Sequence, residues 1–207
     1  MADNIIERYK KLPLGNICDA NGKGGNMDIG IKPVDKNCKM VGYAYSVKCH
    51  PGDNLAIHKA IVEAPKGSVL VVDAGSYCKG GHFGEIMATA CMMRGIAGLV
   101  IDGAVRDAAE IEELGFPVFS RGFNPGGTVK ETVGVTGKPI ICGGLQVRTN
   151  DMIIGDRDGI AVVEQEKISE VLEKAEAIAA KEVHVLELLK QNKSTIEIYQ
   201  FEKLIKK

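Results

Sequence analysis

Apolar and polar residues between positions 40 and 122 alternate between the periods of strands and helices. Four apolar stretches have the composition of strands, namely 40–52, 68–75, 97–103 and 117–122. Between them, apolar residues recur with helical spacing in three stretches, 54–65, 84–95 and 105–116. The central runs "SVLVVDAG" and "AGLVIDG" are continuously apolar, which is typical of strands buried on both faces. This order predicts parallel strands joined by right-handed helical crossovers.

The chain on either side of this region follows other patterns. Residues 2–11 have helical spacing, whereas 15–22 ("GNICDANG") are rich in turn-forming residues and contain Asp19. Glycines gather in 74–84, which predicts a loop. Beyond residue 125, short stretches rich in Val, Ile, Thr and Gly predict several short strands, so part of the sheet should be antiparallel.

The C-terminal part of the chain is predicted to be helical. From residue 167 to about 191, one apolar face is formed by Ile168, Val171, Leu172, Ala175, Ile178 and Ala179. Ser194 and Glu197 have the spacing of a capping box, which predicts the start of a second short helix. This tail has few predicted partners within one chain, so we expect an arm that packs against another subunit.

Together these elements predict an α/β fold. We expect a layered β/β/α domain of the swivelling-domain-like type, with a mixed sheet. Residues 1–165 are assigned to this domain, N-terminal helix included, and 166–207 to a C-terminal helical arm. A chain of 207 residues is long enough for one such core.

Composition and charge exclude several classes of protein. Lys and Arg number 26 against 27 Asp and Glu, a net charge of −1 with both signs spread along the chain, which argues against a nucleic-acid interface. No apolar run approaches the length of a membrane span, and the charged N-terminus differs from a signal peptide. We therefore expect a cytoplasmic protein without nucleic-acid or membrane partners. Six cysteines without a C-x-x-C pair indicate reduced thiols rather than disulfides or a zinc site.

Two strand-to-helix junctions form the candidate site. In a parallel sheet both lie at the same edge, where α/β proteins bind ligands. The first junction begins at Gly84, and the backbone amides of Glu85, Ile86 and Met87 lie at a predicted helix start. Free amides there favour an anion, and the flanking glycine allows a ligand to approach the backbone closely.

The second junction adds two opposite charges. Arg106 presents a planar fork suited to a carboxylate, and Asp107 offers an oxygen ligand for Mg²⁺ or Mn²⁺. Such a site would hold a small 2-oxo acid and stabilise an enolate. The same pair also fits a helix start, where Asp107 and Glu110 would favour the helix dipole. Spacing alone leaves both interpretations open.

The segment "GEIMATACMMRGIAGLVIDGAVRDAAEIEELGFPVFSRG" resembles the central part of the 4-hydroxy-4-methyl-2-oxoglutarate aldolase family. The hallmark of that family is an acid, twenty intervening residues, Arg-Asp and a trailing acid, matched here by Glu85, Arg106-Asp107 and Glu110. The likeness extends over most of the chain, through Asp19-Ala20, "GDNLAIHKAI", "VLVVDAG" and "GTV" at 127–129. One departure is Glu85, where Asp is expected in the aldolases.

The resemblance implies a divalent-metal-dependent (class II) pyruvate aldolase. Such an enzyme cleaves 4-hydroxy-2-oxo acids, 4-hydroxy-4-methyl-2-oxoglutarate among them, to pyruvate, and it also decarboxylates oxaloacetate. The family pattern places the pyruvate carboxylate on the amides of Ile86 and Met87 and on Arg106. It places the metal, Mg²⁺ or Mn²⁺, on Asp107.

The resemblance also implies assembly and an alternative. The family suggests a homotrimer, or a hexamer of two trimers, with Asp19 of a neighbouring subunit supporting metal-bound waters and Glu197 as a further candidate acid. The related regulators of ribonuclease activity share the fold and bind an enzyme without catalysis. In that group the acid after the Arg is expected to be absent, so the presence of Asp107 favours the aldolase.

Overall fold

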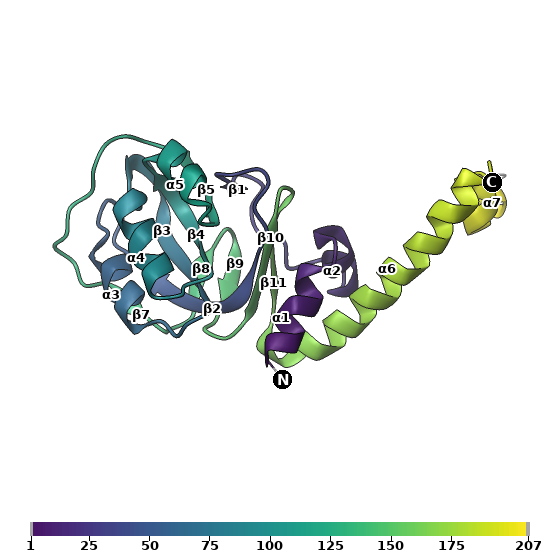
Figure 1. The fold of residues 1–207 in the computed structure, drawn as a ribbon, viewed down its shortest axis with the longest axis horizontal. Helices are drawn as coiled ribbons and strands as arrows, with labels where there is room; N and C mark the ends of the chain where they lie inside the picture. The colour runs from purple at the N-terminus through teal and green to yellow at the C-terminus, as the bar shows by residue number, and fades with distance from the viewer. Residues whose placement is uncertain (1, 206–207) are drawn as a thin grey trace.

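The apolar runs form a mixed sheet at the centre of the molecule, described here for residues 2–205 of a computed structural model (Figure 1). Its strands are β1 Lys32–Pro33, β2 Met40–Lys48, β3 Ser68–Gly81, β4 Gly98–Val105, β5 Val118–Ser120, β6 Gly122–Phe123, β7 Val135–Thr136, β10 Met152–Asp156 and β11 Gly159–Val163. The main path runs β1–β5–β4–β3–β2–β10–β11, with β6 beside β4 and β7 beside β2. A separate hairpin pairs β8 (Ile140–Cys142) with β9 (Leu145–Val147).

The helices connect and cover these strands. They are α1 Ala2–Lys10, α2 Leu14–Ala20, α3 Leu55–Glu63, α4 Glu85–Met93, α5 Ala108–Leu114, α6 Ile168–Lys190, α7 Thr195–Tyr199 and α8 Glu202–Ile205, with a short 3₁₀ turn at Gln165–Lys167. Strands β2 to β5 pair in parallel through crossovers α3, α4 and α5. Strands β10 and β11 add on antiparallel, as does β1 at the other edge. The predicted α/β fold with a mixed sheet and a C-terminal helix is therefore confirmed.

Three apolar clusters hold the layers together. Leu70 and Leu99 of the central strands pack with the buried faces of α3, α4 and α5. The other face of the same strands, with Val71 and Val100, meets β10, β11 and the β8–β9 hairpin. A third cluster, which includes Met152, joins the outer face of β10 and β11 to α1, α2 and α6. The sheet thus curls so that two of its parts pack face to face between helices.

The first half of α6 belongs to this third cluster. Ile168, Val171 and Leu172 are buried against the N-terminal helices. Arg8 of α1 forms a two-pronged ion pair with Glu176, at 2.8 and 2.6 Å. The predicted apolar face of this helix therefore packs within its own chain over about three turns.

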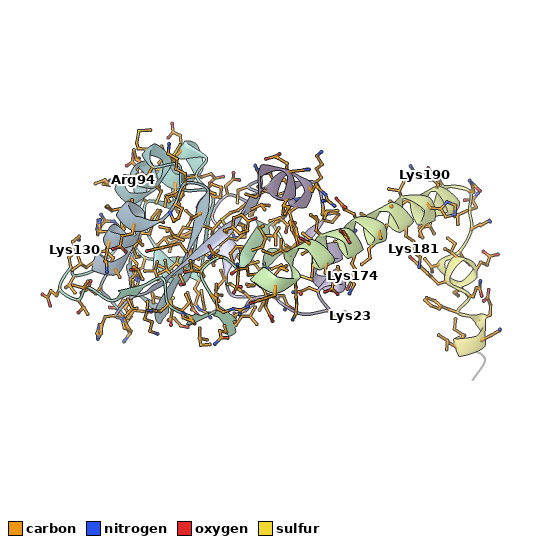
Figure 2. The ribbon with its side chains drawn as sticks, turned by 90° about the horizontal axis from the view of Figure 1, so that it is seen from below. Lys23, Arg94, Lys130, Lys174, Lys181 and Lys190 are labelled. Carbon is orange, nitrogen blue, oxygen red and sulfur yellow. The ribbon has the colours of Figure 1, made fainter. Side chains whose placement is uncertain are left out.

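The second half of α6 extends away from the domain, as the positions of Lys174, Lys181 and Lys190 show (Figure 2). Val183 and Leu186 are more than half exposed there. At its end, Ser194 begins α7 with the capping box predicted from the sequence. None of the helices within residues 2–205, α6 included, combines the length and apolar composition that crossing a membrane requires. The division at residue 165 and the contact of this arm with another subunit stay predictions.

Two predicted segments differ from the structure. Residues 15–22 are predicted to form turns, but 15–20 belong to α2. Burial of Leu14 and Ile17 in the third cluster outweighs the weak helix propensity of "GNICDA". The expected glycine loop at 74–84 largely continues β3 to Gly81, with two register shifts against β4. These irregularities accommodate the glycines while strand pairing continues, as at a β-bulge.

We expect Leu70→Ala to lower the free energy of unfolding by about 2–5 kcal/mol, because the fully buried side chain leaves a cavity between the sheet and its helices. Val62→Ala, at an exposed position on α3, is the control and should change it by less than about 0.5 kcal/mol. Urea denaturation of both variants measures the difference. Equal values for the two would contradict the assignment of Leu70 to the core.

Candidate active site

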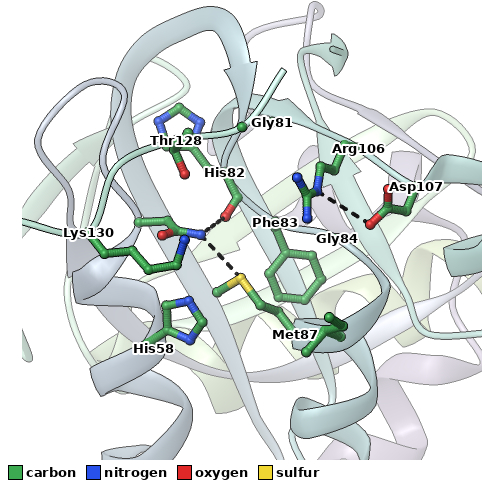
Figure 3. Close-up of a pocket in the computed structure, with 13 residues that line it drawn as sticks. His58, Gly81, His82, Phe83, Gly84, Met87, Arg106, Asp107, Thr128 and Lys130 are labelled. Atoms are coloured by element: carbon green, nitrogen blue, oxygen red, sulfur yellow. Dashed lines mark hydrogen bonds and ion pairs between the residues drawn. The ribbon is translucent and has the colours of Figure 1, made fainter. Parts of the chain in front are cut away.

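The ends of β3 and β4 bring the two predicted junctions side by side. The strands pair in parallel as far as Gly81 and Ala104, so α4 and α5 begin at the same edge of the sheet. Beside these junctions lies a cavity of about 200 Å³ (Figure 3). Of the predicted site residues, those that line it are Gly84, Ile86, Met87, Arg106 and Asp107.

Asp107 turns its carboxylate away from its own helix. It precedes α5 with a left-handed backbone (φ 53°), which a non-glycine residue rarely adopts, and its side chain makes no capping hydrogen bond there. Instead Oδ2 accepts a hydrogen bond from the Glu85 amide at 3.2 Å and lies 3.5 Å from Nε of Arg106. The carboxylate therefore joins the two junctions rather than capping the helix that follows it.

Glycines at the two junctions make this arrangement possible. A Cβ at Gly84 would lie 2.3 Å from Oδ2 of Asp107, closer than any real contact. A Cβ at Gly81 would lie 2.7 Å from Cβ of Arg106. Glycine at 84 therefore leaves room for the Asp107 carboxylate, and glycine at 81 leaves room for Arg106 and for the main-chain oxygen of Asn124, which would lie 2.7 Å from the added Cβ.

The helix amides differ from the prediction of three free donors. The Glu85 N–H donates to Asp107, and the Met87 N–H donates to the carbonyl of Gly84 at 3.1 Å. Among the described residues, the Ile86 amide is the one of the three without a hydrogen-bond partner. One free donor remains because Asp107 occupies the Glu85 amide and the first turn closes on Gly84.

The donors present suit a hard cation that keeps most of its waters. Asp107 is about one-third exposed, and within residues 2–205 no hydrogen bond involves its Oδ1. Among the side chains that the structure describes, those of residues 4–205, no group of three or more His, Cys, Asp or Glu could hold a metal. A closed zinc site needs such a group, whereas Mg²⁺ and Mn²⁺ accept one or two carboxylates plus water and substrate oxygens.

The opposite wall of the cavity contains residues that the sequence analysis did not select. They are Asn54 and His58 at the start of α3, and Thr128 and Lys130 in the loop before β7. In Figure 3, His58 and Lys130 lie on one side of Phe83 and Met87, and Arg106 and Asp107 on the other. The i, i+4 spacing of Asn54 and His58 within "DNLAIH" was the available signal, since it places both on one helix face.

Asn54 and His58 each leave a buried polar atom unsatisfied. Asn54 Oδ1 and His58 Nε2 are the two buried side-chain polar atoms within residues 4–205 that have no hydrogen-bond partner. Leaving such an atom unpaired costs about 1–3 kcal/mol, so native proteins rarely do it. Both residues line the same cavity, which indicates that this wall is built to meet a polar ligand.

His82 fixes the base of this wall. It is fully buried, and its Nε2 lies 3.2 Å from the Gly52 amide. A backbone N–H can only donate, so Nε2 is the acceptor and Nδ1 carries the proton, facing the Ala104 carbonyl at 3.4 Å. Burial lowers the pKa of His82, which keeps the ring neutral. Its carbonyl accepts from Asn54 Nδ2 at 2.8 Å, and that bond sets the orientation of the amide.

Asp53 holds the loop that carries Thr128 and Lys130. Its buried carboxylate accepts hydrogen bonds from the amides of Leu55 (2.9 Å), Glu131 (2.8 Å) and Thr132 (2.7 Å). Burial raises the pKa of Asp53, but these three donors together outweigh it, and the net pKa is lowered. The loop is thus tied to the start of α3 by an ionised side chain.

Two further predicted residues lie outside the cavity of a single chain. Asp19 is in α2, which β10 and β11 separate from α4 and α5 (Figure 1), and it makes no part of the cavity lining. Glu197 is engaged in the capping box of α7, where it accepts from the Ser194 amide at 2.8 Å. A role for either residue in a neighbouring subunit's site stays a prediction.

Comparison with known proteins assigns a family. The model of the RraA-like family, described as Aldolase/RraA, matches residues 14–162, which include both junctions and the facing loop. The chain belongs to the RraA-like family. The resemblance seen in the sequence is thereby confirmed.

Relatives of this RraA-like chain have names of two kinds. A protein of Halalkalibacterium halodurans named "Putative 4-hydroxy-4-methyl-2-oxoglutarate aldolase" is 36% identical over 202 residues, which cover 98% of this chain and 96% of its own. RraAS2 of Streptomyces coelicolor, described as an unusual member of the RNase ES inhibitor RraA protein family, has a TM-score of 0.77 at 23% identity and covers 92% and 96% of the two chains. The RNA-processing inhibitor RraA from Thermus thermophilis has a TM-score of 0.68 at 24% identity, covering 74% and 93%. These two structures establish the shared fold.

We expect Gly84→Ala to weaken binding of Mn²⁺ by about tenfold or more, because the added Cβ displaces the Asp107 carboxylate. Gly24→Ala is the control, since a Cβ there meets only an ordinary contact at 3.9 Å. Isothermal titration calorimetry measures both affinities. Unchanged affinity in the Gly84 variant would contradict the placement of the ion at Asp107.

We expect Asp53→Asn to lower the free energy of unfolding by about 1.5–3 kcal/mol, because an amide NH₂ would face backbone donors that now bind a charged oxygen. Asp35→Asn, at a partly exposed residue whose carboxylate accepts one backbone hydrogen bond, should cost less than about 0.5 kcal/mol. Since the folded-state pKa is lowered, the contribution of Asp53 is present above its unfolded pKa of about 3.9 and is lost as the pH falls below that value. Urea denaturation between pH 7 and pH 3 measures both effects. A stability difference between wild type and variant that persists unchanged at pH 3 would contradict this account.

Proposed function

We propose that the chain is a divalent-metal-dependent pyruvate aldolase that cleaves 4-hydroxy-2-oxo acids and also decarboxylates oxaloacetate. The observation that carries this proposal is the position of Asp107, which leaves its own helix to lie between the two junctions beside Arg106. The aldolase name of the 36% identical relative supports the same reaction class. A helix cap would have left the carboxylate on α5.

The metal and the polar groups at the junctions would bind different groups of the substrate. Asp107 would hold Mg²⁺ or Mn²⁺, which supplies a Lewis acid that draws electrons from the 2-oxo group. Arg106 would pair with the oxygens of the pyruvyl end, and the free Ile86 amide would donate to the carboxylate. As the bond between C3 and C4 breaks, the guanidinium would stabilise the negative charge that develops on the enolate oxygen.

The charges around the cavity favour a small acid with more than one negative group. Arg106 and Lys130 are cations on opposite sides, against the single carboxylate of Asp107 (Figure 3). A volume of about 200 Å³ is below the range of drug-sized ligand pockets, about 300–1,000 Å³. Oxaloacetate and 4-hydroxy-4-methyl-2-oxoglutarate meet both conditions and give the same pyruvate enolate.

The proposal includes an assembly of subunits. We expect a homotrimer, or a hexamer of two trimers, in which Asp19 of a neighbouring copy approaches the site. One feature supports an assembly: the apolar side chains exposed on the second half of α6, which extends away from the domain.

The second candidate is a binding protein that regulates a ribonuclease. The likeness to the two RraA structures favours it at the level of fold. It needs neither a charged cavity beside the junctions nor an Asp held between them, and this chain has both. Fold alone does not decide function, so the aldolase is the better supported candidate.

We expect pyruvate release from 4-hydroxy-4-methyl-2-oxoglutarate and from oxaloacetate with Mg²⁺, and its loss on addition of EDTA. Asp107→Asn should lower both activities by at least about 100-fold, because the charged metal ligand is removed. Glu113→Gln makes the same charge change at an exposed position of α5, outside the cavity, and should leave both activities unchanged. A coupled lactate dehydrogenase assay measures pyruvate.

Turnover that survives EDTA or Asp107→Asn would overturn the metal-dependent mechanism. No pyruvate from either substrate, with a folded and metal-loaded protein, would reject the aldolase. Inhibition of a ribonuclease by the same preparation would then support the second candidate.

A further inference from the structure

The unsatisfied atoms of Asn54 and His58 lie away from the groups that would bind the pyruvyl end. Asn54 is 6% exposed and precedes α3, and His58 follows one helical turn later. Both line the cavity on the side opposite Arg106 and Asp107, as the position of His58 shows (Figure 3). A substrate anchored at Arg106 would therefore extend its C4 end towards them.

The hydrogen bonds of Asn54 define what it can offer. Its Nδ2 donates to the His82 carbonyl at 2.8 Å and lies 3.5 Å from Sδ of Met87. Oδ1 is consequently the group left over, and an amide oxygen can only accept. The ligand must supply a donor at this point, which a carboxylate or a ketone lacks and a hydroxyl possesses.

The surroundings of His58 keep its ring neutral. Burial lowers the pKa of His58, and Lys130 on the facing loop lowers it further. The other titratable or charged groups on the cavity wall are Arg106, Asp107 and the neutral His82. In the tautomer with its proton on Nδ1, a neutral His58 has Nε2 as an acceptor that can take up a proton.

We infer that Asn54 and His58 form the hydroxyl-binding subsite of the aldolase, with His58 as the base that takes the 4-hydroxyl proton. The inference rests on the proposed function and adds a residue that belongs to the aldol reaction alone. Asn54 Oδ1 is the positioning group: it accepts from the hydroxyl as the substrate binds, and the same O–H turns to Nε2 of His58 when its proton is transferred.

The step balances without a co-reactant. The O–H bond breaks and its proton moves to Nε2 of His58, while the oxygen electron pair forms the new C4 carbonyl. The electron pair of the bond between C3 and C4 goes to the pyruvyl fragment as an enolate. The enolate carbon then takes a proton from water as the imidazolium releases one, which restores neutral His58.

Decarboxylation of oxaloacetate makes no demand on this subsite. Its leaving group is CO₂ from an already ionised carboxylate, so no hydroxyl proton has to be removed. The enolate and the groups that stabilise it at Arg106 are the same in both reactions. The ratio of the two activities in one protein therefore isolates the contribution of His58.

The test compares the two activities in His58→Gln, His58→Ala and the control His184→Gln, whose histidine is exposed on α6. We expect His58→Gln to lower kcat for cleavage of 4-hydroxy-4-methyl-2-oxoglutarate by about 100-fold or more, the usual contribution of a general base. Decarboxylation should stay within about threefold of wild type, which also shows that the variant is folded. Added imidazole should restore cleavage in His58→Ala and leave decarboxylation unchanged.

The pH profile gives a second readout. In the wild type, kcat/KM for cleavage should fall as the pH drops through the lowered pKa of His58, because protonation removes the base. This limb should be absent from the cleavage profile of His58→Gln and from decarboxylation by the wild type.

The possible results distinguish the role of His58 from the aldolase activity itself. A parallel loss of both activities in His58→Gln, or a cleavage rate equal to wild type, would overturn the role of His58 and leave the aldolase intact. The role of His58 would be established if His58→Gln kept decarboxylation but lost cleavage, and if imidazole restored cleavage in His58→Ala. If the wild type produced pyruvate from neither substrate, the proposed function would fall and this inference with it.

Discussion

The contact between the carboxylate of Asp107 and the amide of Glu85 is the constraint on which the site depends. It joins two βα junctions that are 22 residues apart in the chain and adjacent in the sheet. The contact requires a left-handed backbone at Asp107 and glycine at position 84. Such local strain is typical of functional sites, because surrounding structure must maintain it. With the carboxylate there, Arg106 and Ile86 line the same cavity.

The other wall depends on the short segment Gly52–Asn54. The Gly52 amide donates to the ring of His82, directly after β3. The Asp53 carboxylate accepts from the Glu131 and Thr132 amides in the loop before β7. The Asn54 side chain, which lines the cavity, donates to the His82 carbonyl. The wall is therefore fixed by hydrogen bonds to buried groups rather than by apolar packing alone. The bond from Asn54 Nδ2 to the His82 carbonyl holds the Asn54 amide in this orientation, which leaves its Oδ1 without a partner.

The RraA-like fold supports these two walls but does not by itself imply an enzyme. A 36% identical relative carries the name of a putative aldolase, and two structures that share the fold carry the names of an RNA-processing inhibitor and of an RNase ES inhibitor family member. What separates the two possibilities in this chain is chemical: a carboxylate held beside an arginine, and a cavity with cations on both sides. Function on a shared fold lies in such sites.

The sequence by itself determined the parallel βα core, the later antiparallel strands, the helical tail and the Arg106-Asp107 junction. Those features depend on local periodicity and on short-range order along the chain, which a single sequence displays. Tertiary structure alone decided that residues 14–20 form α2, that β3 extends to Gly81, and that Asp107 contacts Glu85 instead of capping α5. It also placed Asn54 and His58 on the same cavity wall as the loop that carries Lys130. The physical reason is that burial and hydrogen bonding between distant segments outweigh local propensity, and neither can be read from neighbours in sequence.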